Sequence, residues 1–316
     1  MVQRITATLM TVLLVIVLVS CSTVKKEYQV DLIVKSTDSD FWGSVYDGAK
    51  AAGAKYNINL RFLGPDEEKN YRNQVRIIEQ SAARKPDAII LAAADYSIMT
   101  KPMENAVDAG IPVIMLDSAV DSDRWKSFVS TDNTNAGAVL AAEVAKRIDK
   151  SDAKIGVISF VKNSSPSQER YSGFTNYITQ NTRMSIASTV YCDSDIDLAR
   201  KLTLEMIKNS PDITVIVGLN AQAATGAARA LAELGRKDVF LAAIDCTVEQ
   251  AAYMEQDILK VAVLQNPYLM GYFSVQTTYK VLKKEPVEKN IATDVCVVDK
   301  ENMFSEEVQQ LIFPFY

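Results

Sequence analysis

The sequence predicts an α/β protein built from two doubly wound lobes, each a parallel sheet with helices on both faces. Two observations lead to this prediction. Short apolar, β-branched runs alternate with amphipathic stretches along almost the whole chain, and this alternation is typical of parallel sheets covered on both faces. The length of 316 residues suits two medium lobes better than a single small core.

The predicted elements follow one another in a regular order. We expect strands, each a short apolar run, at residues 30–34, 58–63, 88–92, 113–116, 155–160, 185–190, 214–217, 239–244 and 261–264. Helices are expected at residues 41–56, 67–84, 98–109, 136–148, 198–208, 221–234 and 269–282. Gly110 and Gly235 fall just after helical runs, where a residue with positive φ ends a helix. About six strand–helix units precede residue 130 and a similar number follow it, which favours two lobes.

The first 20 residues have the pattern of an export signal. Arg4 precedes an apolar run over residues 5–19, and the run ends in a lipobox at Cys21. We therefore expect residues 1–20 to be removed, Cys21 to be lipidated and residues 21–27 to link the domain to the outer face of a bacterial membrane. An uncleaved anchor helix is the alternative. Both interpretations place the domain outside the cytoplasm.

Composition excludes several functions. The chain has 34 Lys and Arg against 39 Asp and Glu, with no basic stripe, so a nucleic-acid partner is not expected. It has no histidine, which removes His-based triads and most zinc sites. No cofactor and no metal is predicted. The sequence of residues 43–50 resembles a phosphate loop but falls inside a helix, and residues 121–123 and 193–195 lack the rest of a calcium loop.

Three further cysteines follow Cys21, at Cys192, Cys246 and Cys296. They are widely spaced and form no CxxC pair. We expect buried, inert thiols. One disulfide with a free thiol, or a metal site, are the alternatives.

Polar side chains stand after five of the predicted strands. Ligands of such folds bind beyond the carboxyl ends of the strands. The side chains expected there are two carboxylates, two carboxamides, a nearby guanidinium and an aromatic pair: Asp117, Asp245, Asn220, Gln265, Arg170, Phe41 and Trp42. Carboxylates accept from hydroxyl pairs, a guanidinium donates in a planar fork, and aromatic rings cover the C–H faces of a sugar. This set suits a polyhydroxylated ring.

These residues also carry a resemblance to a known family. The chain resembles the type I periplasmic binding proteins, and within them the ribose-binding branch, over residues 28–299. The resemblance lies in the order of six motifs: Phe41-Trp42 with Gly48-Ala49-Lys50, residues 112–117, residues 168–174, Asn220, Ile244-Asp245 and Gln265-Asn266-Pro267.

The resemblance implies roles for these residues. Phe41 and Trp42 would stack on the ligand, Asp117 and Asp245 would accept from hydroxyls, and the polar cage would be completed by Arg170, Asn220 and Gln265. It also implies three hinge crossings, near residues 130–132, 265 and 293–295. The N-terminal lobe would then comprise residues 28–131 and 266–293, and the C-terminal lobe residues 132–265 and 294–316.

Three positions depart from the ribose-binding pattern. Ser39 stands where the family has an asparagine, Ser118 where an arginine follows the strand-end aspartate, and Ser194 near the place of a second-lobe aromatic. Replacing a bidentate donor with a short hydroxyl is not conservative. Ser39 and Ser118 remain candidate ligand contacts, and ribose is not expected to be the best ligand.

Each candidate also has a structural interpretation. Phe41 and Trp42 would simply pack on the sheet edge, and Arg170 would be a solvated helix charge. Asp117 would cap a turn. Asp245 would be the N-cap of a helix starting near Thr247.

The predicted function is a two-lobed, lipid-anchored receptor that captures a monosaccharide or similar polyol and delivers it to an ABC importer. We expect a monomer without catalytic activity. The alternative is a sensory receptor that docks on a chemoreceptor or a histidine kinase. A lactose-repressor-like effector domain is excluded by the lipobox and the missing helix-turn-helix. A glycosidase would need two carboxylates flanking the scissile bond; Asp117 and Asp245 are the pair that would have to serve, and we expect no product from candidate glycosides. The segment 301–316 is expected to pack back on a lobe; a docking strip is the alternative.

Overall fold

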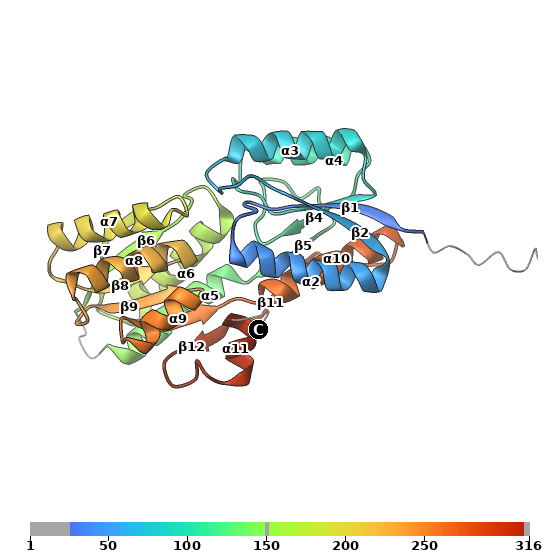
Figure 1. The fold of residues 1–316 in the computed structure, drawn as a ribbon. Helices are drawn as coiled ribbons and strands as arrows, with labels where there is room; N and C mark the ends of the chain where they lie inside the picture. The colour runs from blue at the N-terminus through green and yellow to red at the C-terminus, as the bar shows by residue number, and fades with distance from the viewer. Residues whose placement is uncertain (1–25, 149–151, 313–316) are drawn as a thin grey trace, which may run out of the picture.

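The computed structural model describes residues 26–148 and 152–312, and the predicted leader and Cys21 lie outside them. Two α/β lobes lie side by side (Figure 1). Each lobe contains one six-stranded sheet, so the predicted two-lobed α/β fold is confirmed. Within the described residues, no helix is both long enough and apolar enough to cross a membrane.

The sheet of the first lobe is entirely parallel. Its strand order is β2-β1-β3-β4-β5-β11. The strands are β1 (Tyr28–Ile33), β2 (Ile58–Leu63), β3 (Ala88–Leu91), β4 (Val113–Leu116), β5 (Ser127–Thr131) and β11 (Asn290–Thr293). The central strands are buried along their whole length, which is why they read as unbroken apolar runs in the sequence.

The second sheet repeats this plan with one exception. Its order is β7-β6-β8-β9-β10-β12, and β12 pairs antiparallel to β10 while the other pairs are parallel. The strands are β6 (Lys154–Ser159), β7 (Ser185–Tyr191), β8 (Ile213–Gly218), β9 (Phe240–Ile244), β10 (Leu259–Leu264) and β12 (Cys296–Val298).

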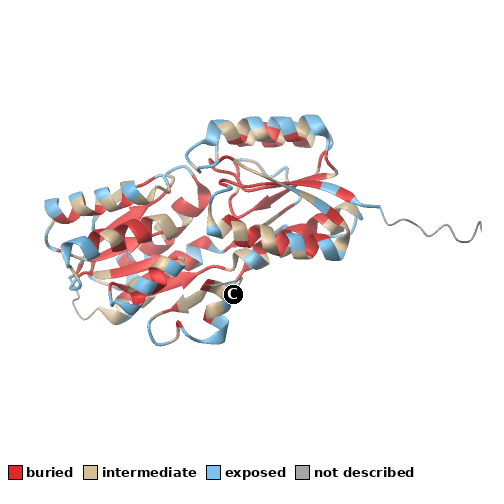
Figure 2. Cartoon of the chain, viewed as in Figure 1, coloured by how far each residue is buried: buried red, intermediate tan, exposed pale blue. Residues whose placement is uncertain are grey.

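Helices cover both faces of the first sheet. The helices α2 (Asp40–Tyr56) and α10 (Pro267–Leu282) pack on one face, and α3 (Tyr71–Arg84) and α4 (Thr100–Asp108) on the other. Alternate residues of β3 enter opposite cores: Ile90 faces α2 and α10, whereas Ile89 and Leu91 face α3 and α4. Figure 2 shows buried residues along the strands and on the inner faces of these helices.

The second lobe has one large core. Its helices are α5 (Asn133–Arg147), α6 (Ser165–Asn181), α7 (Ile196–Asn209), α8 (Ala221–Leu234), α9 (Val248–Glu255) and α11 (Glu306–Ile312). Val308 and Ile312 of α11 are buried in this core together with Met303. Residues 303–312 therefore pack back on the lobe, as expected for the C-terminal segment.

The chain passes between the two sheets three times, as predicted. The crossings follow β5, β10 and β11. Each crossing contributes one residue to a common contact: Thr131, Gln265 and Thr293. The Thr131 hydroxyl donates to Gln265 Oε1 at 2.9 Å and lies 3.5 Å from the Thr293 hydroxyl. All three side chains are buried, so the three hinge strands are tied together by hydrogen bonds at a single point.

Pairs of glycines bring helices close together in both lobes. A Cβ atom added to Gly48 of α2 would collide with the backbone oxygen of Tyr268, and one added to Gly271 of α10 would collide with that of Val45. In the second lobe Gly137 of α5 and Gly173 of α6 play the same part. Each of these helix pairs includes a helix that follows a crossing, so the helices nearest the hinge pack backbone to backbone.

Several elements were not predicted. The strands β5, β11 and β12 and the helix α11 were not expected, and the helices α6 and α9 were expected only as a helix at Arg170 and a helix starting near Thr247, without ranges. The helix expected at 67–84 begins only at Tyr71, because residues 67–69 form a turn that closes with Asn70 N–H donating to Glu67 O. The segment 43–50 lies inside α2, as predicted.

The cysteines agree in part with the expectation of buried, inert thiols. Cys192, Cys246 and Cys296 are free thiols. Burial raises the pKa of Cys192 and of Cys246 to about 12, so both are protonated and unreactive at neutral pH. Cys296 is only partly buried, which corrects the expectation that all three would be buried.

Candidate functional site

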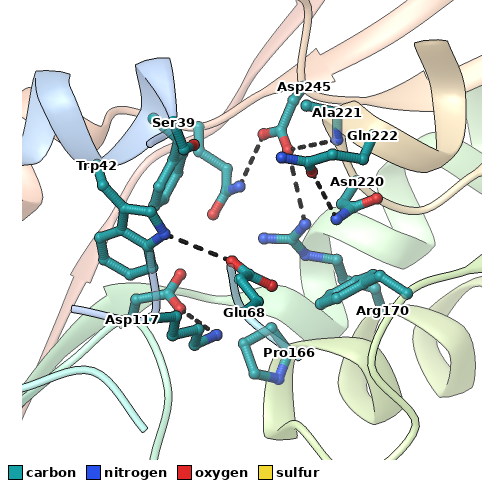
Figure 3. Close-up of a pocket in the computed structure, with 14 residues that line it drawn as sticks. Ser39, Trp42, Glu68, Asp117, Pro166, Arg170, Asn220, Ala221, Gln222 and Asp245 are labelled. Carbon is teal, nitrogen blue, oxygen red and sulfur yellow. Dashed lines mark hydrogen bonds and ion pairs between the residues drawn. The ribbon is translucent and has the colours of Figure 1, made fainter. Parts of the chain in front are cut away.

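The carboxyl ends of strands from both sheets face one another across a cleft between the lobes. Its volume is about 410 Å³, part of which is open to solvent. Small-molecule sites commonly measure roughly 300–1,000 Å³, so the cleft falls in the size range of a small-molecule site. The lining residues come from both lobes and are Lys35, Ser39, Phe41, Trp42, Glu68, Asp117, Phe160, Pro166, Arg170, Asn220, Ala221, Gln222, Asp245 and Gln265 (Figure 3).

In both lobes the cleft aspartate has the same left-handed backbone conformation. Asp117 follows β4 and Asp245 follows β9, and both have positive φ, 60° and 73°. The Asp117 N–H donates to Val129 O of β5, and the Asp245 N–H donates to Val263 O of β10. Aspartate is one of the few residues that tolerate this conformation, and such strain concentrates at functional sites. Each carboxylate is therefore held at the end of a central strand.

Arg170 and Asp245 form the polar centre of the second lobe's wall. Arg170 is 3 % exposed, and its Nη1 lies 3.9 Å from Asp245 Oδ2. Its Nε donates to Asn133 Oδ1 at 2.8 Å and its Nη1 to Leu219 O at 2.9 Å. Burial raises the pKa of the Asp245 carboxyl, and the charge of Arg170 opposes this shift. The hydrogen bonds to Asn133 and Leu219 thus hold the guanidinium in one orientation, as a preorganised donor requires.

Gln265 and Asn220 hold neighbouring parts of this wall. Gln265 donates to Asp245 Oδ1 at 2.8 Å, which links the carboxylate to the hinge point at Thr131. Asn220 is the N-cap of α8, where its side chain accepts from the Ala223 N–H, and it also donates to Gln222 Oε1 at 2.9 Å. Asn220 therefore shapes the cleft while it starts a helix.

Aromatic rings line both sides. Phe41 and Trp42 lie edge to face with ring centroids 5.0 Å apart. Trp42 is 2 % exposed and belongs to the core of the first lobe. It therefore packs in the core and also lines the cleft. On the second lobe, Phe160 lies 5.5 Å from the Arg170 guanidinium carbon. Phe160, in the loop after β6, is therefore an aromatic on the second lobe's side of the cleft, although Ser194 itself is not aromatic.

Two charged residues of the cleft were missed by the sequence analysis. The ammonium of Lys35, just after β1, lies 2.7 Å from Asp117 Oδ2. Glu68 precedes α3; its Oε1 accepts from Trp42 Nε1 at 3.4 Å and its Oε2 from the Ser194 hydroxyl at 2.7 Å. The position of Lys35 after a buried strand was an available signal. Glu68 gave none, because it sits in a turn that the sequence predicted as helix.

Direct contacts join the lobes around the cleft. Besides the bond between Ser194 and Glu68, the Ala119 N–H donates to the Ser165 hydroxyl at 3.1 Å and the Tyr96 N–H to Asn163 O at 2.9 Å. Lys69 lies 3.4 Å from Asp195. The structure is therefore a closed arrangement of the two lobes.

The predicted site residues can now be placed. All but one line the cleft: Ser39, Phe41, Trp42, Asp117, Arg170, Asn220, Asp245 and Gln265. Ser118 does not. It is fully buried and its hydroxyl donates to Ala93 O at 2.7 Å.

Two of the structural interpretations are wrong. Asp245 is not the cap of α9; Thr247 is, through a capping box with Gln250. Arg170 is not a solvated helix charge, because it is buried.

Two hinged parallel-sheet lobes around a polar cleft define a two-lobed ligand-binding protein. A family model confirms this class. Residues 30–286 match the Periplasmic binding protein domain, and the chain belongs to this family.

Individual relatives agree with the family assignment. The ribose import binding protein of Bacillus subtilis is 25 % identical over 270 residues, which cover 85 % of this chain and 86 % of that protein. An ABC transporter solute-binding protein from Agrobacterium vitis, solved with bound D-fucose, is 32 % identical with a TM-score of 0.87, covering 90 % of this chain and 100 % of that one. A sugar transporter structure from Clostridium phytofermentans is 38 % identical with a TM-score of 0.81, covering 87 % and 100 %.

Proposed function

We propose that this protein is an extracytoplasmic receptor that binds a neutral monosaccharide or similar polyol between its lobes and delivers it to an ABC importer. The proposal rests mainly on the charged side chains that both walls of the cleft contain. Each lobe contributes a buried cation and an aspartate, Lys35 with Asp117 and Arg170 with Asp245. Hydroxyl groups both donate and accept, so a polyol satisfies such mixed walls. The names of the relatives, a ribose import protein and a D-fucose-bound solute receptor, support the same ligand class.

Closure of the lobes supplies the mechanism. A sugar that touches Phe41 and Asp117 on one lobe and Arg170 and Asp245 on the other contacts both walls only when the lobes are closed. It therefore binds the closed form more tightly and shifts the population toward it. The importer would distinguish loaded from empty receptor by the relative positions of the lobes.

The proposal is tested by a thermal-shift screen of the soluble domain against pentoses, hexoses and polyols. A ligand that binds only the native state adds about 2.7 kcal/mol of stability at 100 times its Kd. We expect at least one hexose, 6-deoxyhexose or polyol to raise the unfolding temperature more than D-ribose, because Ser39 is short and Ser118 is turned away from the cleft. D-Ribose as the strongest stabiliser would contradict the ranking. No shift with any sugar would contradict the function.

We propose further that lipidation of Cys21 anchors the protein to the membrane. Cys21→Ser is expected to move the protein to the soluble fraction without changing sugar affinity, because the cleft is built from residues 35–265. Membrane fractionation with calorimetry on the released protein checks both parts. A Cys21→Ser protein that stays in the membrane fraction after signal cleavage would overturn the lipid anchor.

A further inference from the structure

Lys35 is a buried lysine in the wall of the cleft. The residue is 3 % exposed, and lysine is almost never this deeply buried unless it is paired. Its pair is Asp117, itself 4 % exposed, with Nζ 2.7 Å from Oδ2. The ammonium also lies 5.9 Å from the Trp42 ring centroid, within the range of a cation–π contact.

The ammonium has more protons than its neighbours use. A lysine carries three N–H donors. Over residues 26–148 and 152–312 the structure places one oxygen against Nζ, Asp117 Oδ2, in an ion pair. Donors left without an acceptor in a buried position cost free energy. Since Lys35 lines the cleft, a hydroxyl oxygen of a bound ligand would give the ammonium a further acceptor.

Asp117 offers the complementary group beside it. Its Oδ2 faces Lys35, and a carboxylate has a second oxygen, Oδ1, that accepts hydrogen bonds. A donor and an acceptor side by side match a hydroxyl, which accepts from one and donates to the other. An ether oxygen can accept from Lys35 but cannot donate to Asp117, so the pair favours a free ligand hydroxyl at this end of the cleft.

We propose that Lys35 is a ligand-contacting, specificity-determining residue: its ammonium donates to one hydroxyl oxygen of the sugar while Asp117 accepts from that hydroxyl or its neighbour. This rests on the proposed function and adds to it. It assigns to one residue the selection of a single ligand hydroxyl.

The test combines a protein variant with ligand variants. Calorimetry is performed with the sugar that binds most tightly among D-ribose, D-arabinose, D-galactose, D-glucose and D-fucose, and with each of its monodeoxy analogues. The proteins are the wild type, Lys35→Met, and Lys50→Met as the matched control, because Lys50 lies on the outer surface of α2 with its side chain 53 % exposed. Thermal unfolding verifies that each variant folds.

We expect the wild type to lose on the order of 10- to 100-fold in affinity when one particular hydroxyl is removed. Lys35→Met should bind the parent sugar about as weakly as the wild type binds that analogue, and removing the same hydroxyl should then cost it little more. Lys50→Met should reproduce the wild-type pattern. If Lys35→Met unfolds, Lys35→Met/Asp117→Asn removes both buried charges together and should show the same loss of discrimination.

Two results would overturn the inference while leaving the proposed function intact. One is wild-type affinity for the parent sugar in Lys35→Met. The other is an equal loss for every analogue, which would make Lys35 a positioning residue for Asp117. If the wild type binds no sugar at all, the proposed function fails and the inference fails with it.

Discussion

Asp245→Ala is expected to weaken sugar binding by about 30- to 1,000-fold, which corresponds to about 2 to 4 kcal/mol. The carboxylate accepts from Gln265 at 2.8 Å and from the Ala221 N–H at 3.1 Å, and it lies beside Arg170. Its loss would leave ligand hydroxyls without an acceptor and would remove the carboxylate that balances the buried charge of Arg170. Calorimetry with the tightest-binding sugar measures the effect.

Arg170→Ala should have an effect of similar size, since Arg170 and Asp245 act on the ligand together. Asp212→Ala is the matched control, because Asp212 is an exposed aspartate of the same lobe. Wild-type affinity in a folded Asp245→Ala or Arg170→Ala protein would remove that residue from the site.

Gly271→Ala is expected to destabilise the protein by about 1 to 3 kcal/mol. In an ordinary helical position this substitution stabilises, because glycine has the poorer helix propensity. At Gly271 the new Cβ would collide with the backbone oxygen of Val45, and backbone cannot rotate away as a side chain can. The helices α2 and α10 would have to separate.

Gly43→Ala provides the control for this prediction. Gly43 lies in α2, and its Cβ would meet nothing within 4 Å. This variant should gain roughly 0.5 to 1 kcal/mol, so the midpoints of thermal unfolding should move in opposite directions. A Gly271→Ala protein as stable as Gly43→Ala would show that the close approach of the helices is not required.

The cleft residues at strand ends could be predicted from the sequence. Asp117, Asn220, Asp245 and Gln265 were found because apolar strand runs are unambiguous and parallel topology brings their carboxyl ends together. The three crossings were expected only from the family resemblance. Short strands such as β12, with three residues, carry no periodicity to detect.

Contacts between distant segments could not be predicted in this way. Lys35 is a cleft residue because Asp117, far along the chain, neutralises it, and Ser118 is lost from the cleft because left-handed backbone at Asp117 turns the next residue toward Ala93. The strand-end position of Lys35 was a local signal, but its pairing with Asp117 and the burial of Ser118 depend on contacts between segments far apart in the sequence. The same holds for Glu68, whose partner Ser194 belongs to the other lobe.

The three crossings also determine the order in which the protein can be completed. The first sheet includes β11, and α10 covers one of its faces. Both elements are synthesised only after every parallel strand of the second sheet. Joining such distant segments carries a loop-closure cost and slows folding. Neither lobe is one continuous stretch of chain, so a ribosome that has not reached residue 293 has produced no finished lobe. Neither native lobe can therefore be completed until most of the chain has been made.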